Sequence, residues 1–87
     1  MNWQIYIILS SDNSLYTGIT TVLERRFQQH AHGCGAKYFR GRDPIEVMYL
    51  ERGHTRNTAA KRELQIKKMT RAGKYQLISS EMNEIRI

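Results

Sequence analysis

Five residues of this chain are of types that could move a proton or hold a phosphate group: Tyr6, Tyr16, Arg26, His30 and Glu63. A carboxylate can bind a divalent metal ion, and an arginine can neutralise a phosphate. A tyrosine or a histidine can transfer a proton. Each tyrosine taken alone is more often a packing residue, because tyrosine suits a half-buried strand. The five residues form a candidate site only if the fold brings them together.

The first predicted helix directs two ionisable residues toward its apolar face. At about 100° per residue, with Val22 set at zero, Phe27 falls at about 140° around the helix axis. Arg26 falls at about 40° and His30 at about 80°, inside the apolar arc. Arg25 falls at about 300°, on the solvent side. We therefore expect Arg26 and His30 to point inward, and Arg25 to be an ordinary surface charge.

A second predicted helix repeats this pattern around Glu63. With Ala59 set at zero, Leu64 falls at about 140° and Glu63 at about 40°, near the middle of the apolar face. Lys67 falls at about 80°, but its long stem can carry the charge outward. A buried lone charge is costly, so Glu63 needs a partner, a metal ion or a cleft. Two interpretations stay open: an Arg26–Glu63 salt bridge between the helices, or a cleft that receives both charges.

Three short strands must position these residues. Alternating apolar residues predict strands from Trp3 to Leu9 and from Leu15 to Ile19, joined as a hairpin across polar turn residues. A third strand is expected from Ile45 to Glu51. Short strands with helices packed on them indicate an α+β fold, with a three-stranded antiparallel sheet flanked by helices, rather than a doubly wound parallel sheet.

Capping residues predict where the two main helices begin. The segment Thr21 to Glu24 matches a capping box, and the helix that it opens should run to about Ala31. Thr58 is the expected cap of a long helix that starts at Ala59. The remaining expectations are one helical turn between Ala36 and Arg40, an end of the long helix near Arg71, an interruption at Ala72-Gly73 and a short helix from Lys74 to Ser79.

Composition favours a polyanionic partner. The chain has 87 residues, a net charge of +6 and a pI of about 9.8, which fits one domain that binds nucleic acid or an anionic membrane surface. No apolar stretch approaches the about 18 residues of a membrane span, and the N-terminus lacks a signal peptide's basic region, so a cytoplasmic protein is expected. Cys34 is the only cysteine, which excludes an intrachain disulfide. A zinc site from His30, His32, Cys34 and His54 matches no common spacing.

Several segments together carry a family resemblance. Gln4-Ile5-Tyr6 and Tyr16-Thr17-Gly18 stand at the spacing of a GIY and a YIG motif, followed by an arginine, a histidine one turn later, and a glutamate on a later helix. On these residues the chain resembles the GIY-YIG nuclease superfamily, and most closely its small stand-alone bacterial branch, the YhbQ-like proteins. The resemblance covers about Trp3 to Ile78. Its further segments are Leu15 to Thr21, Leu23 to Arg26 with His30, Gly35 to Tyr38, Arg40-Gly41 and Ala60 to Leu64.

The resemblance implies a single GIY-YIG endonuclease-like domain over residues 1–80, with a C-terminal tail over residues 81–87. It implies a metal-dependent DNA endonuclease that hydrolyses phosphodiester bonds, in DNA repair or recombination, without an obligate protein partner. Glu63 would bind Mg²⁺ or Mn²⁺, and Arg26 would contact the scissile phosphate. Tyr6 or Tyr16 would accept the proton of the attacking water, and His30 would orient a tyrosine or relay the proton.

Other positions extend or weaken this site. Gly18 would permit close backbone approach beside the second tyrosine. Gln4 replaces the usual glycine of the first motif, and Ile19 and the segment Lys74 to Gln76 replace a lysine and an asparagine of some members, so a leaner site with weaker turnover is expected. Candidate phosphate contacts are Lys37, Arg40, Arg42, Lys67, Lys68 and Arg71, although a solvated charge is the simpler interpretation of any single one.

Two alternatives belong to other functional classes. A nucleic-acid-binding module could keep the fold without cutting, but a degenerate copy should have lost some of the five site residues. A membrane-surface or protein-interaction domain would need a broad apolar helix face, and in both main helices charges interrupt that face. A nuclease is therefore the favoured interpretation.

Overall fold

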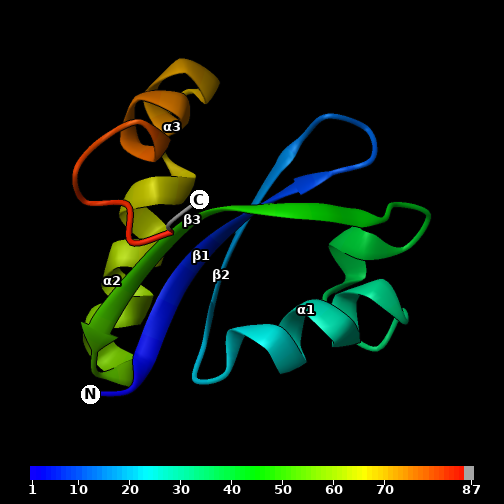
Figure 1. Cartoon of the computed structure of the whole chain (residues 1–87), viewed down its shortest axis with the longest axis horizontal. Helices are drawn as coiled ribbons and strands as arrows, with labels where there is room; N and C mark the ends of the chain where they lie inside the picture. Colours follow the sequence, from blue (N-terminus) through cyan, green and yellow to red (C-terminus); the bar gives the residue numbers. More distant parts are fainter. Residues whose placement is uncertain (86–87) are drawn as a thin grey trace.

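The sheet confirms the expected α+β architecture. A computed structural model describes residues 1–85, in which β1 (Trp3–Ser10) lies between β2 (Leu15–Thr20) and β3 (Pro44–His54) in one antiparallel sheet (Figure 1). Tyr6 lies opposite Gly18, and Ile8 lies opposite Tyr16. Successive side chains of a strand point to opposite faces, so these four residues share one face of the sheet.

Helices cover both faces of the sheet, as Figure 1 shows. The face that carries Tyr6 packs against α1 (Leu23–Ala31) and the short 3₁₀ helix η1 (Lys37–Phe39). The opposite face, with Ile5 and Ile7, packs against α2 (Arg56–Lys67) and α3 (Arg71–Ile78). Because β1 is central, its side chains are covered from both sides, which explains its run of apolar residues. Within residues 1–85, no helix is long and apolar enough to cross a bilayer.

The start of α1 differs from the expectation. Its N-cap is Val22, without a side-chain cap, so the predicted capping box at Thr21 does not form. The Val22 N–H instead donates to the Thr20 hydroxyl at 3.2 Å. The hydroxyl that accepts the Val22 N–H is therefore that of Thr20, the last residue of β2, which stands one position before the predicted cap Thr21.

The start of α2 was also predicted wrongly, by three residues. Thr55 is its cap: the Thr55 hydroxyl accepts the Thr58 N–H at 3.1 Å, and the Thr58 hydroxyl accepts the Thr55 N–H at 3.0 Å. Thr58 thus belongs to the first turn of the helix rather than preceding it. Thr70 caps α3 in a similar way, which places Gly73 inside that helix and ends α2 earlier than expected.

The segment after α3 folds back along the outer edge of β3. The Asn83 side chain donates to the Met48 and Ile78 carbonyls, both at 2.9 Å, and accepts the Leu50 N–H at 3.2 Å. The Glu84 N–H donates to the Leu50 carbonyl at 2.8 Å. The described part of the predicted tail is therefore packed against the sheet; residues 86 and 87 lie outside the described residues.

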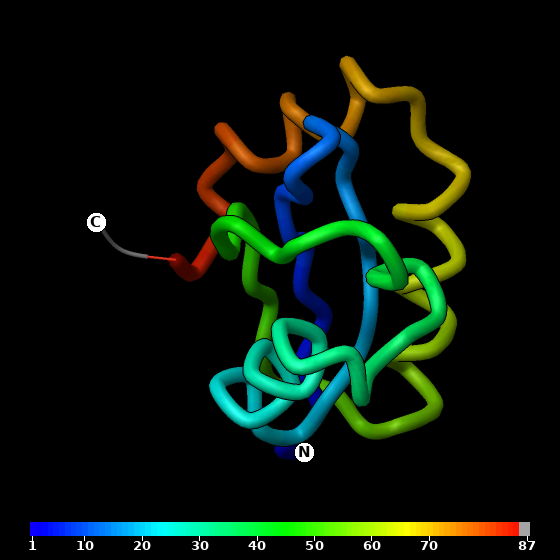
Figure 2. Tube along the Cα trace, turned by 90° about the vertical axis from the view of Figure 1, so that its right-hand side faces the viewer, coloured from blue at the N-terminus to red at the C-terminus, as the bar shows by residue number. Residues whose placement is uncertain are grey.

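The edge strand β2 lies close to α2. Figure 2 shows α2 running alongside β2, and the two elements are in contact. Residues of α2 can therefore reach the β2 edge of the sheet face that carries the two tyrosines. This placement lets Glu63, on the helix that covers the opposite face, take part in the same site.

Candidate active site

A close approach of two strands sets the positions of the tyrosines. The Tyr6 ring lies over Gly18, where an added Cβ would stand 2.4 Å from the Tyr6 hydroxyl oxygen. Only glycine leaves this space. The ring centroids of Tyr6 and Tyr16 are 6.2 Å apart. Tyr6 is fully buried, whereas Tyr16 is half-buried.

His30 projects from the last turn of α1 onto the tyrosines. Its side chain is buried, as the helix-face argument predicted, and its Nε2 lies 2.9 Å from the Tyr6 hydroxyl. On the other side of the ring, Nδ1 accepts the Ala36 N–H at 3.3 Å. Burial, with the positive charge of Arg26, lowers the pKa of His30 to about 4. The imidazole is therefore neutral at physiological pH.

The two tyrosines are in different electrostatic surroundings. Burial, with the neighbouring Tyr16, raises the pKa of Tyr6 far above its usual value, although Arg26 opposes this effect. Burial also raises the pKa of Tyr16, and the positive charges of Lys67 and Arg26 oppose it there. Tyr16 is also less buried than Tyr6.

Arg26 and Glu63 stand beside the tyrosines, and their charges shift the pKa of both rings. The salt bridge between them that the helix positions allowed is not formed. Arg26 donates to the Gln29 side chain at 3.0 Å, and one Glu63 oxygen pairs with Lys67 at 3.2 Å. Arg26 and Glu63 therefore do not neutralise each other, and the Glu63 carboxylate has Lys67 as its partner instead.

The donor set around Glu63 fits a magnesium-type ion. Within residues 1–85, no group of three or more histidine, cysteine, aspartate or glutamate side chains could hold a metal ion. The Glu63 carboxylate, whose side chain is 19% exposed, would be the protein's contribution. Mg²⁺ commonly binds through one or two carboxylates and completes its shell with water and phosphate oxygens.

Comparison with known proteins decides the family. Residues 2–76 match the family described as "GIY-YIG catalytic domain". The chain belongs to the GIY-YIG family. A UPF0213 protein of Clostridium perfringens is 51% identical over 93% of this chain and 86% of its own length. UPF0213 protein YhbQ of Escherichia coli is 40% identical over 88% of this chain and 77% of its own length. The expected resemblance to YhbQ-like proteins is thereby confirmed.

A solved structure supports the GIY-YIG fold. The solution NMR structure of a UPF0213 protein from Bacillus halodurans matches with a TM-score of 0.60 at 38% identity, over 97% of this chain and 89% of that chain. The three-stranded sheet with its flanking helices is therefore shared with a solved UPF0213 protein. The names of these relatives state no activity.

The candidate phosphate-binding residues of this GIY-YIG domain fall into two groups. Lys37, Arg40 and Lys68 are exposed. The other three have partners within the chain: Arg42 pairs with Asp12 at 2.6 Å and lies over the Tyr38 ring, Lys67 pairs with Glu63, and Arg71 lies over the Tyr75 ring. Arg42 and Lys67, whose charges are paired with carboxylates, are therefore the weakest of the six candidates.

Sequence reasoning missed the loop that closes over His30. At Gly35 an added Cβ would stand 2.2 Å from Nδ1 of His30, and the next residue, Ala36, donates its amide to that atom. The Phe39 ring lies 4.5 Å from the imidazole. Hydrophobic periodicity cannot reveal such contacts, and the glycine in the loop was the one available signal.

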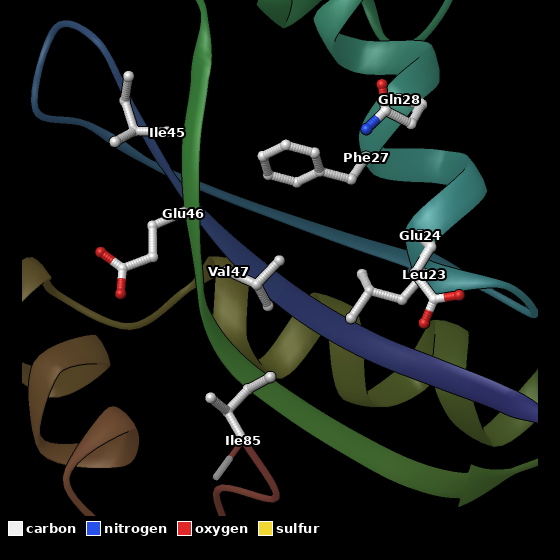
Figure 3. A pocket seen from close by; sticks show the side chains of 8 residues that line it. All are labelled: Leu23, Glu24, Phe27, Gln28, Ile45, Glu46, Val47 and Ile85. Atoms are coloured by element: carbon white, nitrogen blue, oxygen red, sulfur yellow. The ribbon is translucent and has the colours of Figure 1, made fainter. Parts of the chain in front are cut away.

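An apolar groove lies away from the candidate site. A groove of about 340 Å³ separates α1 from β3 and is lined mainly by apolar side chains (Figure 3). Phe27 and Leu23 face Val47 across it, and Ile85 closes one end. The tyrosines and Glu63 do not line this groove, so the candidate site and the apolar groove are separate features.

Proposed function

We propose that this GIY-YIG domain is a metal-dependent endonuclease that hydrolyses phosphodiester bonds in DNA and acts in DNA repair or recombination. The observation that supports the proposal most is the meeting of Tyr6, Tyr16 and His30 on one sheet face, with the charges of Arg26 and Glu63 beside them. A site for phosphate hydrolysis needs a proton acceptor, a cation for the phosphate and a ligand for a metal ion.

Tyr16 is the better candidate for the general base. It is half-buried, and Lys67 and Arg26 favour its ionised form, whereas Tyr6 is enclosed and harder to ionise. Tyr16 would first lose its hydroxyl proton to solvent, and the phenolate would then take a proton from a water molecule as the water oxygen bonds to phosphorus. The bond from phosphorus to the leaving oxygen then breaks.

Arg26 and Glu63 would act on the phosphate from either side of this step. The Arg26 guanidinium can donate to the scissile phosphate and offset the charge that grows on it. Glu63 would hold Mg²⁺ or Mn²⁺, which supplies positive charge at the phosphate and the leaving oxygen. The net charge of +6 favours a DNA partner, and exposed Lys37, Arg40 and Lys68 are proposed phosphate contacts.

The test is a nuclease assay on supercoiled plasmid, branched DNA and single-stranded DNA, with Mg²⁺, Mn²⁺ or EDTA. Glu63→Gln keeps the size of the side chain and removes its charge, and Tyr16→Phe removes only the hydroxyl. We expect metal-dependent nicking by the wild type and a loss of at least about 100-fold in each variant, the lower end for a missing acid–base group. Glu46→Gln, an exposed glutamate of β3, is the matched control and should cut like the wild type.

Two results would contradict the proposal. Cutting that survives Glu63→Gln at the wild-type rate would remove Glu63 from the mechanism. Salt-sensitive DNA binding without cutting on any of these substrates would instead favour the non-catalytic nucleic-acid-binding module. Because binding is measured separately from nicking, the two functions give different patterns.

A further inference from the structure

We propose that the loop after α1 fixes His30 as a hydrogen-bond donor to Tyr6, so that His30 holds the Tyr6 oxygen in place and does not accept the Tyr6 proton. Gly35 and Ala36 are the positioning residues. The proposal rests on the proposed nuclease function for its catalytic consequence. Its structural part concerns which ring nitrogen of His30 carries the proton.

The Ala36 amide settles the direction of both hydrogen bonds. A backbone N–H can only donate, so Nδ1 of His30, 3.3 Å away, must present a lone pair. A neutral imidazole has one N–H and one lone pair, which places the proton on Nε2. Nε2 faces the Tyr6 hydroxyl oxygen at 2.9 Å. His30 therefore donates, and the Tyr6 oxygen accepts.

Close approach of the loop depends on Gly35. A Cβ at this position would stand 2.2 Å from Nδ1 and 2.9 Å from Cε1 of His30, so any side chain would push the loop or the ring away. The end of α1 holds the same loop, because the Cys34 N–H donates to the Gln29 carbonyl at 2.8 Å. The loop is thus bonded to the helix that carries His30. Because Gly35 has no side chain, the loop can approach closely enough for the Ala36 amide to contact Nδ1.

This arrangement selects between the two roles that the resemblance implied for His30, which were to orient a tyrosine or to relay the proton. With Nε2 already protonated and Nδ1 occupied by the Ala36 amide, the neutral ring has no free lone pair with which to take the Tyr6 proton. The Tyr6 proton is therefore directed away from His30. His30 then acts through Tyr6 as a positioning residue, which agrees with Tyr16 as the base.

Ala36→Pro tests the proposal by removing the Ala36 N–H, which is the donor to Nδ1 of His30. Ala36 has a φ of −66°, which a proline ring adopts without strain, and the preceding residue is a glycine, which has no Cβ to clash with the ring. The variant lacks the N–H, and the proline Cδ stands where the amide hydrogen pointed at Nδ1, so the imidazole must also move away from the loop. Ala36→Ser keeps the N–H and is the matched control.

The readout is the ¹⁵N chemical shifts of the His30 ring at neutral pH, measured on the full chain without DNA. We expect a protonated Nε2 and a bare Nδ1 in the wild type and in Ala36→Ser. In Ala36→Pro we expect the form protonated on Nδ1 to appear, together with a nuclease rate that is lower by about tenfold, the loss for about 1.4 kcal/mol. A protonated Nδ1 in the wild type, or unchanged His30 shifts in Ala36→Pro, would overturn the proposal.

Gly35→Ala is the second variant, and it keeps the amide while displacing the loop. It should weaken the bond from Ala36 to Nδ1 and change the His30 shifts in the same direction as Ala36→Pro. If Ala36→Pro fails to fold, the wild-type ring and Gly35→Ala decide the question. A wild type that does not cut would defeat the nuclease proposal, but the protonation of the ring would still be read, so the two failures are distinguishable.

Discussion

Tyr6 and Gly18 depend on each other across the β1–β2 pair. The ring occupies the space that a side chain at position 18 would fill, and its hydroxyl then reaches His30 at 2.9 Å. The glycine has no positive φ, so its function here is to leave room rather than to adopt a special backbone conformation. Tyr6 therefore packs as one unit with Gly18 and His30.

Gly18→Ala should damage both the site and the fold. The new methyl group would stand 2.4 Å from a buried oxygen, so we expect the free energy of unfolding to fall by about 1–3 kcal/mol, as for other overpacked cores. Nuclease turnover should fall further, because Tyr6 must move from His30. Urea unfolding and the plasmid assay measure the two effects.

Gly73→Ala in α3 is the control for this substitution. There the nearest atom to the added Cβ is the Thr70 hydroxyl oxygen at 3.3 Å, and alanine favours a helix over glycine. The control should cut like the wild type. Wild-type turnover in Gly18→Ala would contradict the idea that Tyr6 must stay where Gly18 allows it.

The residue types of the site were predictable, but their partners were not. Motif spacing and helix faces selected Tyr6, His30 and Glu63, because these depend on short-range order along the chain. The contacts of Gly35 and Ala36 with His30 depend on how a loop closes after the helix ends. No periodicity encodes that closure, so sequence reasoning assigned the loop no role in positioning the histidine.

At the scale of elements, the strands were better predicted than the helix starts. Alternating burial gives a strand a clear pattern of period two, and all three strands lie where expected, with β3 extending further to His54. The position of a helix start instead depends on which single threonine hydroxyl accepts a backbone N–H there. Two threonines stand close together near each helix start: Thr20 and Thr21 before α1, and Thr55 and Thr58 at α2. Only the folded backbone determines which hydroxyl accepts a hydrogen bond from a later backbone N–H, and in both cases it is the earlier threonine.

Thr55→Ala and Thr21→Ala should differ in their effect on stability. Thr55 makes a reciprocal capping box with Thr58, so its loss should lower the free energy of unfolding by about 1 kcal/mol. Thr21 makes no cap on α1, and its loss should cost less than about 0.5 kcal/mol, as for ordinary surface changes. Urea unfolding of the two variants measures the difference. Equal losses would show that the cap of α1 is Thr21 after all.

At the scale of the whole molecule, the sheet separates two cores that share β1. One core contains Tyr6 and His30 under α1; the other contains Tyr49 under α2 and α3. The second core also encloses the Glu51 carboxylate, which accepts hydrogen bonds from Tyr49, His54 and Arg62. Burial would raise the pKa of Glu51, but these hydrogen bonds outweigh it and lower the pKa below its usual value.

His30 and Glu51, which are both buried, make the free energy of unfolding depend on pH in two separate ranges. Unfolded His30 binds a proton as the pH falls through 6.5, whereas folded His30 resists protonation down to about 4. The unfolded chain therefore holds more protons between these values, so stability present above pH 6.5 is lost progressively as the pH falls toward 4. Glu51 contributes to the loss only below its unfolded pKa of 4.5, because its folded pKa is lower still.

His30→Asn should flatten the pH dependence of stability between about pH 6.5 and 4.5, since the group that resists protonation is gone. The variant also loses the hydrogen bond to Tyr6, so its free energy of unfolding should be lower at every pH. The test is therefore the slope of the free energy of unfolding against pH, and not its value at one pH. Urea unfolding across this range gives the slope. His32→Asn, at an exposed position two residues along the chain, should keep the wild-type slope. An equally steep slope in His30→Asn would mean that folded His30 binds its proton as readily as unfolded His30 over this pH range, and a protonated ring could not accept the Ala36 amide at Nδ1.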